Sequence, residues 1–154
     1  MKDYIVTIDD LRTELKKDLL PSDKGVYFVF SAQKNADAKY SIIRLLYIGR
    51  SSDVNKRING KHHKHEDISR ECTNDVGIPV YYYGEVSPNT DDDVIRVEAA
   101  LIFHNQPVLN QTADKNFNHQ DTHILLQRNE NSCNGKILPS AFGDKEFIVK
   151  KTSI

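Results

Sequence analysis

Gly25-Val-Tyr-Phe-Val-Phe30 and Ile42-Ile-Arg-Leu-Leu-Tyr-Ile48 decide the fold of this 154-residue chain. Both stretches are rich in aromatic and β-branched residues and are bounded by polar turns or glycine, which is typical of β-strands. The polar loop from Gln33 to Lys39 separates them, so we predict a hairpin with a long loop. Val80-Tyr-Tyr-Tyr-Gly-Glu-Val86 has the same character. The predicted fold class is α+β, with a small central three-stranded, mainly antiparallel sheet.

Helices are expected to flank this sheet. Ser51 or Ser52 can cap a helix that carries Arg57. Thr90 can cap a second helix, because three aspartates follow it and the dipole of a helix favours negative charge in its first turn. The apolar run Val94–Phe103 continues this second helix, which has the clearest helical pattern in the chain.

The two ends of the chain are predicted to add further elements. Tyr4–Ile8 can form a short strand, and Thr7 with Asp10 resembles the capping box of an N-terminal helix. Leucines recur every four residues along that helix, at Leu11, Leu15 and Leu19. A C-terminal β-rich extension is predicted from three segments, Thr122–Gln127, Lys136–Leu138 and Phe147–Lys150.

Length and composition indicate a single globular domain over residues 1–154, with 38% hydrophobic and 28% charged residues. We predict a core at 22–112 and extensions at 1–21 and 113–154 that pack on it. No segment approaches the roughly 20 consecutive apolar residues that cross a bilayer, and the first residues lack the apolar part of a secretory signal. Two cysteines, Cys72 and Cys133, are too few for a disulfide framework. A reducing, cytoplasmic setting and no membrane partner are therefore expected.

Charge is unevenly distributed along the chain, although the formal net charge is only −1. Residues 44–70 hold seven Lys or Arg against three Asp or Glu, together with three histidines. Residues 85–98 hold five acids against one arginine. One face of the molecule could therefore attract phosphates. The simpler interpretation is that both runs are solvated faces.

Glu98 interrupts the apolar face of its predicted helix. One turn away on either side lie four apolar residues, Val94, Ile95, Leu101 and Ile102. A carboxylate in such surroundings needs a partner, a proton or a metal ion, because burying an unpaired charge costs several kcal/mol. An internal salt bridge to an arginine explains the pattern as well as a catalytic role does. The roles of Tyr27 and Tyr47 are equally undecided between structure and catalysis, since a tyrosine on a strand usually fills a core.

Five elements in a fixed order resemble the signature of the GIY-YIG nuclease family. Gly25-Val26-Tyr27 and Tyr47-Ile48-Gly49 are similar to its paired tripeptides, with Val in place of the usual Ile. Arg57 follows Tyr47 by ten residues, where the family has its essential arginine. Glu98 and Asn110 match its metal-binding glutamate and downstream asparagine. The resemblance extends over more than half of the chain.

The chain departs from the family pattern just after the arginine. Four residues beyond Arg57, where the family has His or Tyr, this chain has Lys61, followed by His62 and His63. Either Lys61 takes that role, or one extra residue near Gly60 moves His62 into place, and we assign His62. A zinc site could be drawn from three side chains, His63, His65 and Cys72, but their spacing fits no standard zinc motif.

The resemblance implies a role for each matched residue. Tyr27 would act as the general base, Tyr47 would orient the water or the phosphate, and Arg57 would contact the phosphate. Glu98 would be the one carboxylate ligand of Mg²⁺ or Mn²⁺, and Asn110 would tie the end of its helix to the site. His62 would assist the base. Contacts to substrate are expected from four further positions: Gly49, Arg50, Lys61 and His63.

The function that follows is a metal-dependent endonuclease that hydrolyses phosphodiester bonds, in DNA more readily than in RNA. A restriction, defence or structure-selective enzyme would fit, and a homodimer could cut both strands of a duplex. One alternative is a nucleic-acid-binding module without catalysis. Another is an accidental resemblance, in which Glu98 sits in an internal ion pair.

Overall fold

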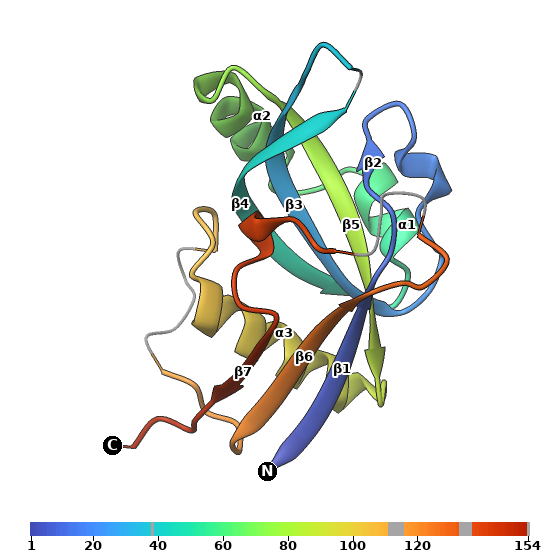
Figure 1. Ribbon diagram of the computed structural model, residues 1–154. Helices are drawn as coiled ribbons and strands as arrows, with labels where there is room; N and C mark the ends of the chain where they lie inside the picture. The colour runs from blue at the N-terminus through green and yellow to red at the C-terminus, as the bar shows by residue number, and fades with distance from the viewer. Residues whose placement is uncertain (38, 111–115, 133–136, 154) are drawn as a thin grey trace.

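Seven strands form one strongly curled, mixed sheet in the residues that the computed structural model describes, which are 1–37, 39–110, 116–132 and 137–153 (Figure 1). The strands are β1 (Lys2–Ile8), β2 (Arg12–Thr13), β3 (Gly25–Lys34), β4 (Tyr40–Ser51), β5 (Ile78–Ser87), β6 (Thr122–Arg128) and β7 (Glu146–Val149). The α-helices are α1 (Val54–Asn59), α2 (His65–Asn74) and α3 (Asp91–Asn105). Two 3-10 turns are η1 (Lys17–Leu19) and η2 (Ser140–Phe142).

The strand order is β4-β3-β5-β1-β6-β7, and β2 pairs with β5 beside this path. β1 and β6 run parallel, and the other pairs are antiparallel. Both chain ends lie at the bottom of the view in Figure 1, beside β1, β6 and β7. No helix in the described ranges is long and apolar enough to cross a membrane.

The predicted three-stranded sheet is wrong in its extent. Its three strands are present as antiparallel neighbours in β3, β4 and β5. The sheet continues, however, because β1 pairs with the far end of β5, from Ile5 opposite Ser87 to Ile8 opposite Gly84. Strand pairing between segments almost 80 residues apart leaves no local pattern in the sequence, so the size of the sheet could not be read from periodicity.

The predicted N-terminal helix is also wrong, while the short strand before it is confirmed as part of β1. Arg12 and Thr13 pair with β5 as strand β2, and only the 3-10 turn η1 follows. Leu15 is 93% exposed and Leu19 is 56% exposed. These two leucines therefore face solvent. A short helix that buries no apolar face against the rest of the protein is marginal in water.

Other predicted elements are confirmed with adjusted ends. Thr90 and Asp93 form a capping box at the start of α3. Helix α1 is capped by Asp53 rather than by Ser51 or Ser52, since the Asp53 side chain accepts a hydrogen bond from the backbone of Lys56. Helix α2 was not predicted. Strands β6 and β7 match two predicted C-terminal strands; of the third, residue 136 lies outside the described ranges, and 137–138 are not in a strand.

The sheet separates two hydrophobic clusters. On β3, Phe28 and Phe30 point into a cluster that includes residues of α3 and η2. Tyr27 and Val29 alternate to the other face, where α1 and α2 contribute residues such as Ile58. This alternation positions the first candidate catalytic residue on the face that α1 and α2 cover.

Candidate active site

A buried tyrosine–histidine pair forms the centre of the candidate site. The Tyr27 hydroxyl lies 2.7 Å from Nε2 of His62, and the two residues are 1% and 8% exposed. Tyr27 stands on β3 opposite Gly49 of β4. A Cβ atom at Gly49 would collide with the phenol ring and hydroxyl of Tyr27. Gly49 therefore allows the phenol to lie across β4 and to reach the loop between α1 and α2.

The hydrogen bonds of His62 define its tautomer. Its Nδ1 accepts the backbone N–H of Lys64 at 3.1 Å, so a neutral ring carries its proton on Nε2. That proton is then donated to the phenol oxygen of Tyr27. Burial, and then the positive charges around it, lower the pKa of His62 to about 4, which keeps the ring neutral at pH 7. His62 is thus arranged to support a tyrosinate rather than to remove its proton.

Tyr47, His63 and Arg57 surround this pair. The ring of Tyr47 lies 6.1 Å from that of Tyr27 and 5.6 Å from that of His62, measured between centroids. His63 stacks on His62 at 4.9 Å, and Nη2 of Arg57 lies 3.0 Å from Nδ1 of His63. The pKa of both tyrosines is raised by burial, and the positive charge of Arg57 offsets only part of this increase. The exposed guanidinium thus lies at the mouth of a more buried polar cluster.

Glu98 approaches the cluster from α3. Its side chain is 22% exposed, and burial raises its pKa. After burial, its negative charge is the main cause that raises the pKa of Tyr47, and it is a minor cause of the raised pKa of Tyr27. Arg50 Nε lies 3.3 Å from the carboxylate, which is the ion pair expected of a structural role. The Arg50 side chain is 46% exposed, so this pair lies partly in solvent.

Asn110 fastens the segment after α3 to β4. Its Oδ1 accepts the N–H of Ile48 and its Nδ2 donates to the carbonyl of Ile48, both at 2.9 Å. The backbone N–H of Leu109 donates to the carbonyl of Leu46 at 2.8 Å. These three bonds hold the edge strand on either side of Tyr47, which makes Asn110 a positioning residue.

Lys61 is not brought into the cluster, although it stands four residues after Arg57. It is exposed in the loop after α1, and the contacts of the described residues join His62, not Lys61, to Tyr27. Sequence reasoning missed Lys24, which precedes the first tripeptide and forms a 3.1 Å ion pair with Asp91. Lys24 and Arg50 line a cavity of about 290 Å³, together with Ser51 and Ser52.

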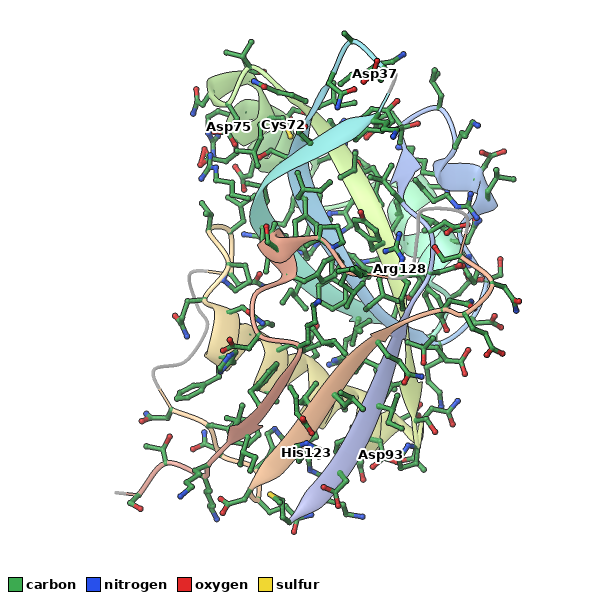
Figure 2. All side chains as sticks on the ribbon, viewed as in Figure 1. Asp37, Cys72, Asp75, Asp93, His123 and Arg128 are labelled. Atoms are coloured by element: carbon green, nitrogen blue, oxygen red, sulfur yellow. The ribbon has the colours of Figure 1, made fainter. Side chains whose placement is uncertain are left out.

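The chemistry of the donors limits the metal that the site could take. Within the described ranges no three His, Cys, Asp or Glu side chains are grouped as metal ligands, so the zinc site of His63, His65 and Cys72 is not formed. Cys72 is buried on α2, near the top of Figure 2, and Cys133 lies outside the described ranges. One half-buried carboxylate fits Mg²⁺ or Mn²⁺, which take most of their ligands from water and substrate.

No model of a known protein family matches the chain, and no curated protein or solved structure matches it significantly. The resemblance to GIY-YIG nucleases therefore depends on the motif residues of the sequence alone.

Proposed function

We propose that the chain is a metal-dependent nuclease that hydrolyses phosphodiester bonds with a catalytic cluster like that of GIY-YIG enzymes. The observation that carries the proposal is the convergence of residues from four separate segments. Tyr27 on β3 is bonded to His62, Tyr47 on β4 lies beside both rings, and Glu98 of α3 is paired with Arg50, three residues after Tyr47 on β4. A core that needed only apolar packing would not gather these groups at one place.

Tyr27 would take the proton of the attacking water as a phenolate. His62 donates to the phenol oxygen, and a donor to the charged form favours that form. Burial opposes ionisation, and so does the charge of Glu98. A divalent cation on Glu98 would supply net positive charge there, which reverses the effect of the bare carboxylate and stabilises the phosphate oxygens.

Arg57 and Tyr47 would position the phosphate. The guanidinium of Arg57 is exposed and held by His63, so it can offer two parallel N–H groups to a phosphate. Tyr47 can orient either the water or the phosphate through its hydroxyl. The water oxygen would form the new bond to phosphorus as the bond to the 3′ oxygen breaks. The cavity beside Arg50 and Lys24 can accept a neighbouring phosphate of the same strand.

A cleavage assay of the variant Glu98→Gln tests this proposal. Wild type and variant are incubated with supercoiled plasmid, single-stranded DNA and RNA, each with Mg²⁺, Mn²⁺ or EDTA. We expect metal-dependent cutting by the wild type and a loss of about 100-fold or more in the variant, as for removal of a group that stabilises the transition state. Glu85→Gln is the matched control, because Glu85 is exposed on β5 and lies outside the cluster.

Cutting that persists in EDTA or in Glu98→Gln would contradict the proposed chemistry. Binding at low salt without cutting of any substrate would favour the second candidate, a binding module, to which the exposed Arg57 also points. If the protein neither cuts nor binds any substrate, Glu98 has only a structural role, in its ion pair with Arg50.

A further inference from the structure

A second polar groove lies at the ends of β2 and β6, and it is larger than the cavity beside Arg50. Its volume is about 770 Å³, within the range of small-molecule sites. Strands β2, β4, β5 and β6 contribute to its walls, and Arg128 of β6 is labelled near the middle of Figure 2. The charged residues that line it are Asp10, Arg12, Lys16, Lys39 and Arg128.

Positive charge dominates this groove. Among the described residues that line it, four cationic side chains face one carboxylate, in a protein whose formal net charge is −1. Asp10 accepts a hydrogen bond from Ser132 at 2.5 Å, and Ser132 accepts one from Nε of Arg128 at 3.1 Å. The one carboxylate is therefore engaged through Ser132, and the groove carries a net positive charge that favours an anion.

Two arginines of the groove carry buried nitrogen atoms without a hydrogen-bond partner. These are Nε of Arg12 and Nη1 of Arg128, within the part of the chain that the structure describes. The large majority of buried side-chain polar atoms in proteins are hydrogen-bonded, and a buried donor left without an acceptor is costly. Both nitrogens are closed to solvent, so a ligand would reach them only after each guanidinium rotates. Two unmet donors on residues that line one groove indicate that an acceptor belongs there.

The groove lies on the face of the sheet opposite the tyrosine–histidine pair. Tyr82, in its floor, packs with Phe30 and Phe142, whereas Tyr81 and Tyr83 point toward the cluster of Tyr27. The guanidinium of Arg128 lies over the ring of Tyr82, with its carbon 5.7 Å from the ring centroid. The groove is thus not an extension of the candidate active site.

We propose that this groove binds the phosphate group of a nucleotide or of a nucleic acid strand. Guanidinium groups match the oxygens of phosphate with pairs of parallel N–H donors, and Lys16 and Lys39 add point charges at the rim. Tyr40 provides a half-buried aromatic side chain beside them, on which a base can stack. This proposal does not depend on the nuclease function.

Isothermal titration of the full chain in EDTA tests the groove apart from cleavage. The probes are inorganic phosphate, AMP, adenosine, and one single-stranded oligonucleotide with and without a 5′ phosphate. We expect saturable binding of AMP and none of adenosine. Tighter binding of the phosphorylated oligonucleotide than of both AMP and the unphosphorylated oligonucleotide would identify a strand end as the ligand. Equal binding of the two oligonucleotides, both tighter than AMP, would identify phosphates within a strand, and binding of AMP as tight as that of either would identify a nucleotide.

The double variant Lys16→Gln/Lys39→Gln tests the location. Both lysines are exposed, so the fold should be retained, and we expect about tenfold weaker binding of AMP. Lys150→Gln/Lys151→Gln removes the same charge from exposed positions after β7 and should change the affinity less than about twofold. Arg12→Lys keeps the charge and removes the planar pair of donors, so it should also weaken binding.

Three results would overturn the proposal. Binding of none of the probes would mean that the groove holds no phosphate ligand. Equal binding of AMP and adenosine would mean that phosphate is not recognised. Equal weakening in both double variants would mean that the chain attracts anions by its overall charge alone.

Discussion

At the scale of single residues, the candidate site consists of polar groups that are buried where the sheet would otherwise hold apolar side chains. Tyr27 and His62 satisfy each other at 2.7 Å, and the backbone of Lys64 satisfies the remaining nitrogen of the ring. This arrangement leaves the hydroxyl proton of Tyr27 free to be given elsewhere, because His62 already supplies the proton of their shared hydrogen bond. The protonation state of His62 is therefore central to both stability and chemistry.

We expect the stability of the protein to depend on pH through His62. Its pKa is about 4 when folded and 6.5 in an ordinary environment, so the unfolded chain binds the proton more readily. The free energy of unfolding therefore falls as pH drops from about 6.5 to about 4, by at most about 3 kcal/mol. Urea unfolding of His62→Gln should show a weaker fall over this range than that of the wild type.

His65→Gln is the control for this measurement, because His65 is exposed at the start of α2 and its charge is only a minor cause of the low pKa of His62, after burial. The raised pKa of Glu98 acts in the opposite direction, and it remains in all three proteins. The same slope of stability against pH in His62→Gln and in the wild type would contradict the assigned environment of His62.

Gly49→Ala should damage both stability and cleavage. The added methyl group would overlap the phenol of Tyr27, which the backbone of β3 holds in place. We expect a loss of about 1–3 kcal/mol in the free energy of unfolding, as for overpacked cores, and displacement of Tyr27 from His62. Urea unfolding and the plasmid assay measure the two effects, with Ser69→Ala, at an exposed position of α2, as the control. Full stability in Gly49→Ala would mean that Tyr27 has another place to lie.

At the scale of elements, the edge strand β4 carries Tyr47, so its position needs support on the unpaired side. Edge strands expose backbone groups, and proteins commonly cover them. Here Leu109 and Asn110 do so, through bonds to Leu46 and Ile48. The asparagine side chain imitates one residue of an additional strand, since its amide both donates and accepts as a peptide group does.

Asn110→Ala should therefore loosen β4. Removing the amide leaves the N–H and carbonyl of Ile48 without these partners, which we expect to cost about 1–3 kcal/mol. Because Tyr47 adjoins Ile48, kcat should fall more than KM rises. Asn110→Asp keeps the acceptor and removes the donor, so it should be impaired as well. Asn74→Ala, at an exposed asparagine of α2, should leave both stability and rate unchanged; an equal effect there would argue against the edge support.

At the scale of the whole molecule, one core links segments from both ends of the chain. Phe142, on η2, lies 5.1 Å from Phe28, 4.7 Å from Phe30 and 4.9 Å from Tyr82, between ring centroids. β1 and β6 add residues such as Val6 and Ile124 to the same cluster. The central strands thus bury one of their faces with help from the flanking segments.

Phe142→Ala should destabilise the whole protein. The ring is 2% exposed, and we expect its removal to cost about 3–5 kcal/mol of the free energy of unfolding. Ile148→Ala, at a side chain of β7 that is 51% exposed, should cost far less. Thermal unfolding measures both, and a small effect of Phe142→Ala would mean that the C-terminal segment is dispensable to the core.

The sequence alone determined what depends on local pattern. Runs of aromatic and β-branched residues predicted β3, β4 and β5, Thr90 followed by three aspartates predicted the start of α3, and the apolar neighbours of Glu98 predicted its partial burial. These features depend on hydrogen bonds and burial within a few residues, so they can be read from spacing.

Only the tertiary structure decided what depends on distant partners. Arg12 and Thr13 form strand β2 because they pair with Tyr81 and Val80 of β5. Leu15 and Leu19, which follow them, are exposed to solvent. The turn after α1 carries His62 to Tyr27 and leaves Lys61 exposed, which the spacing after Arg57 could not show. The basic groove gathers residues from four strands and could not be seen as any one run of charge. In each case the free energy comes from contacts between segments far apart in the chain, which local pattern does not encode.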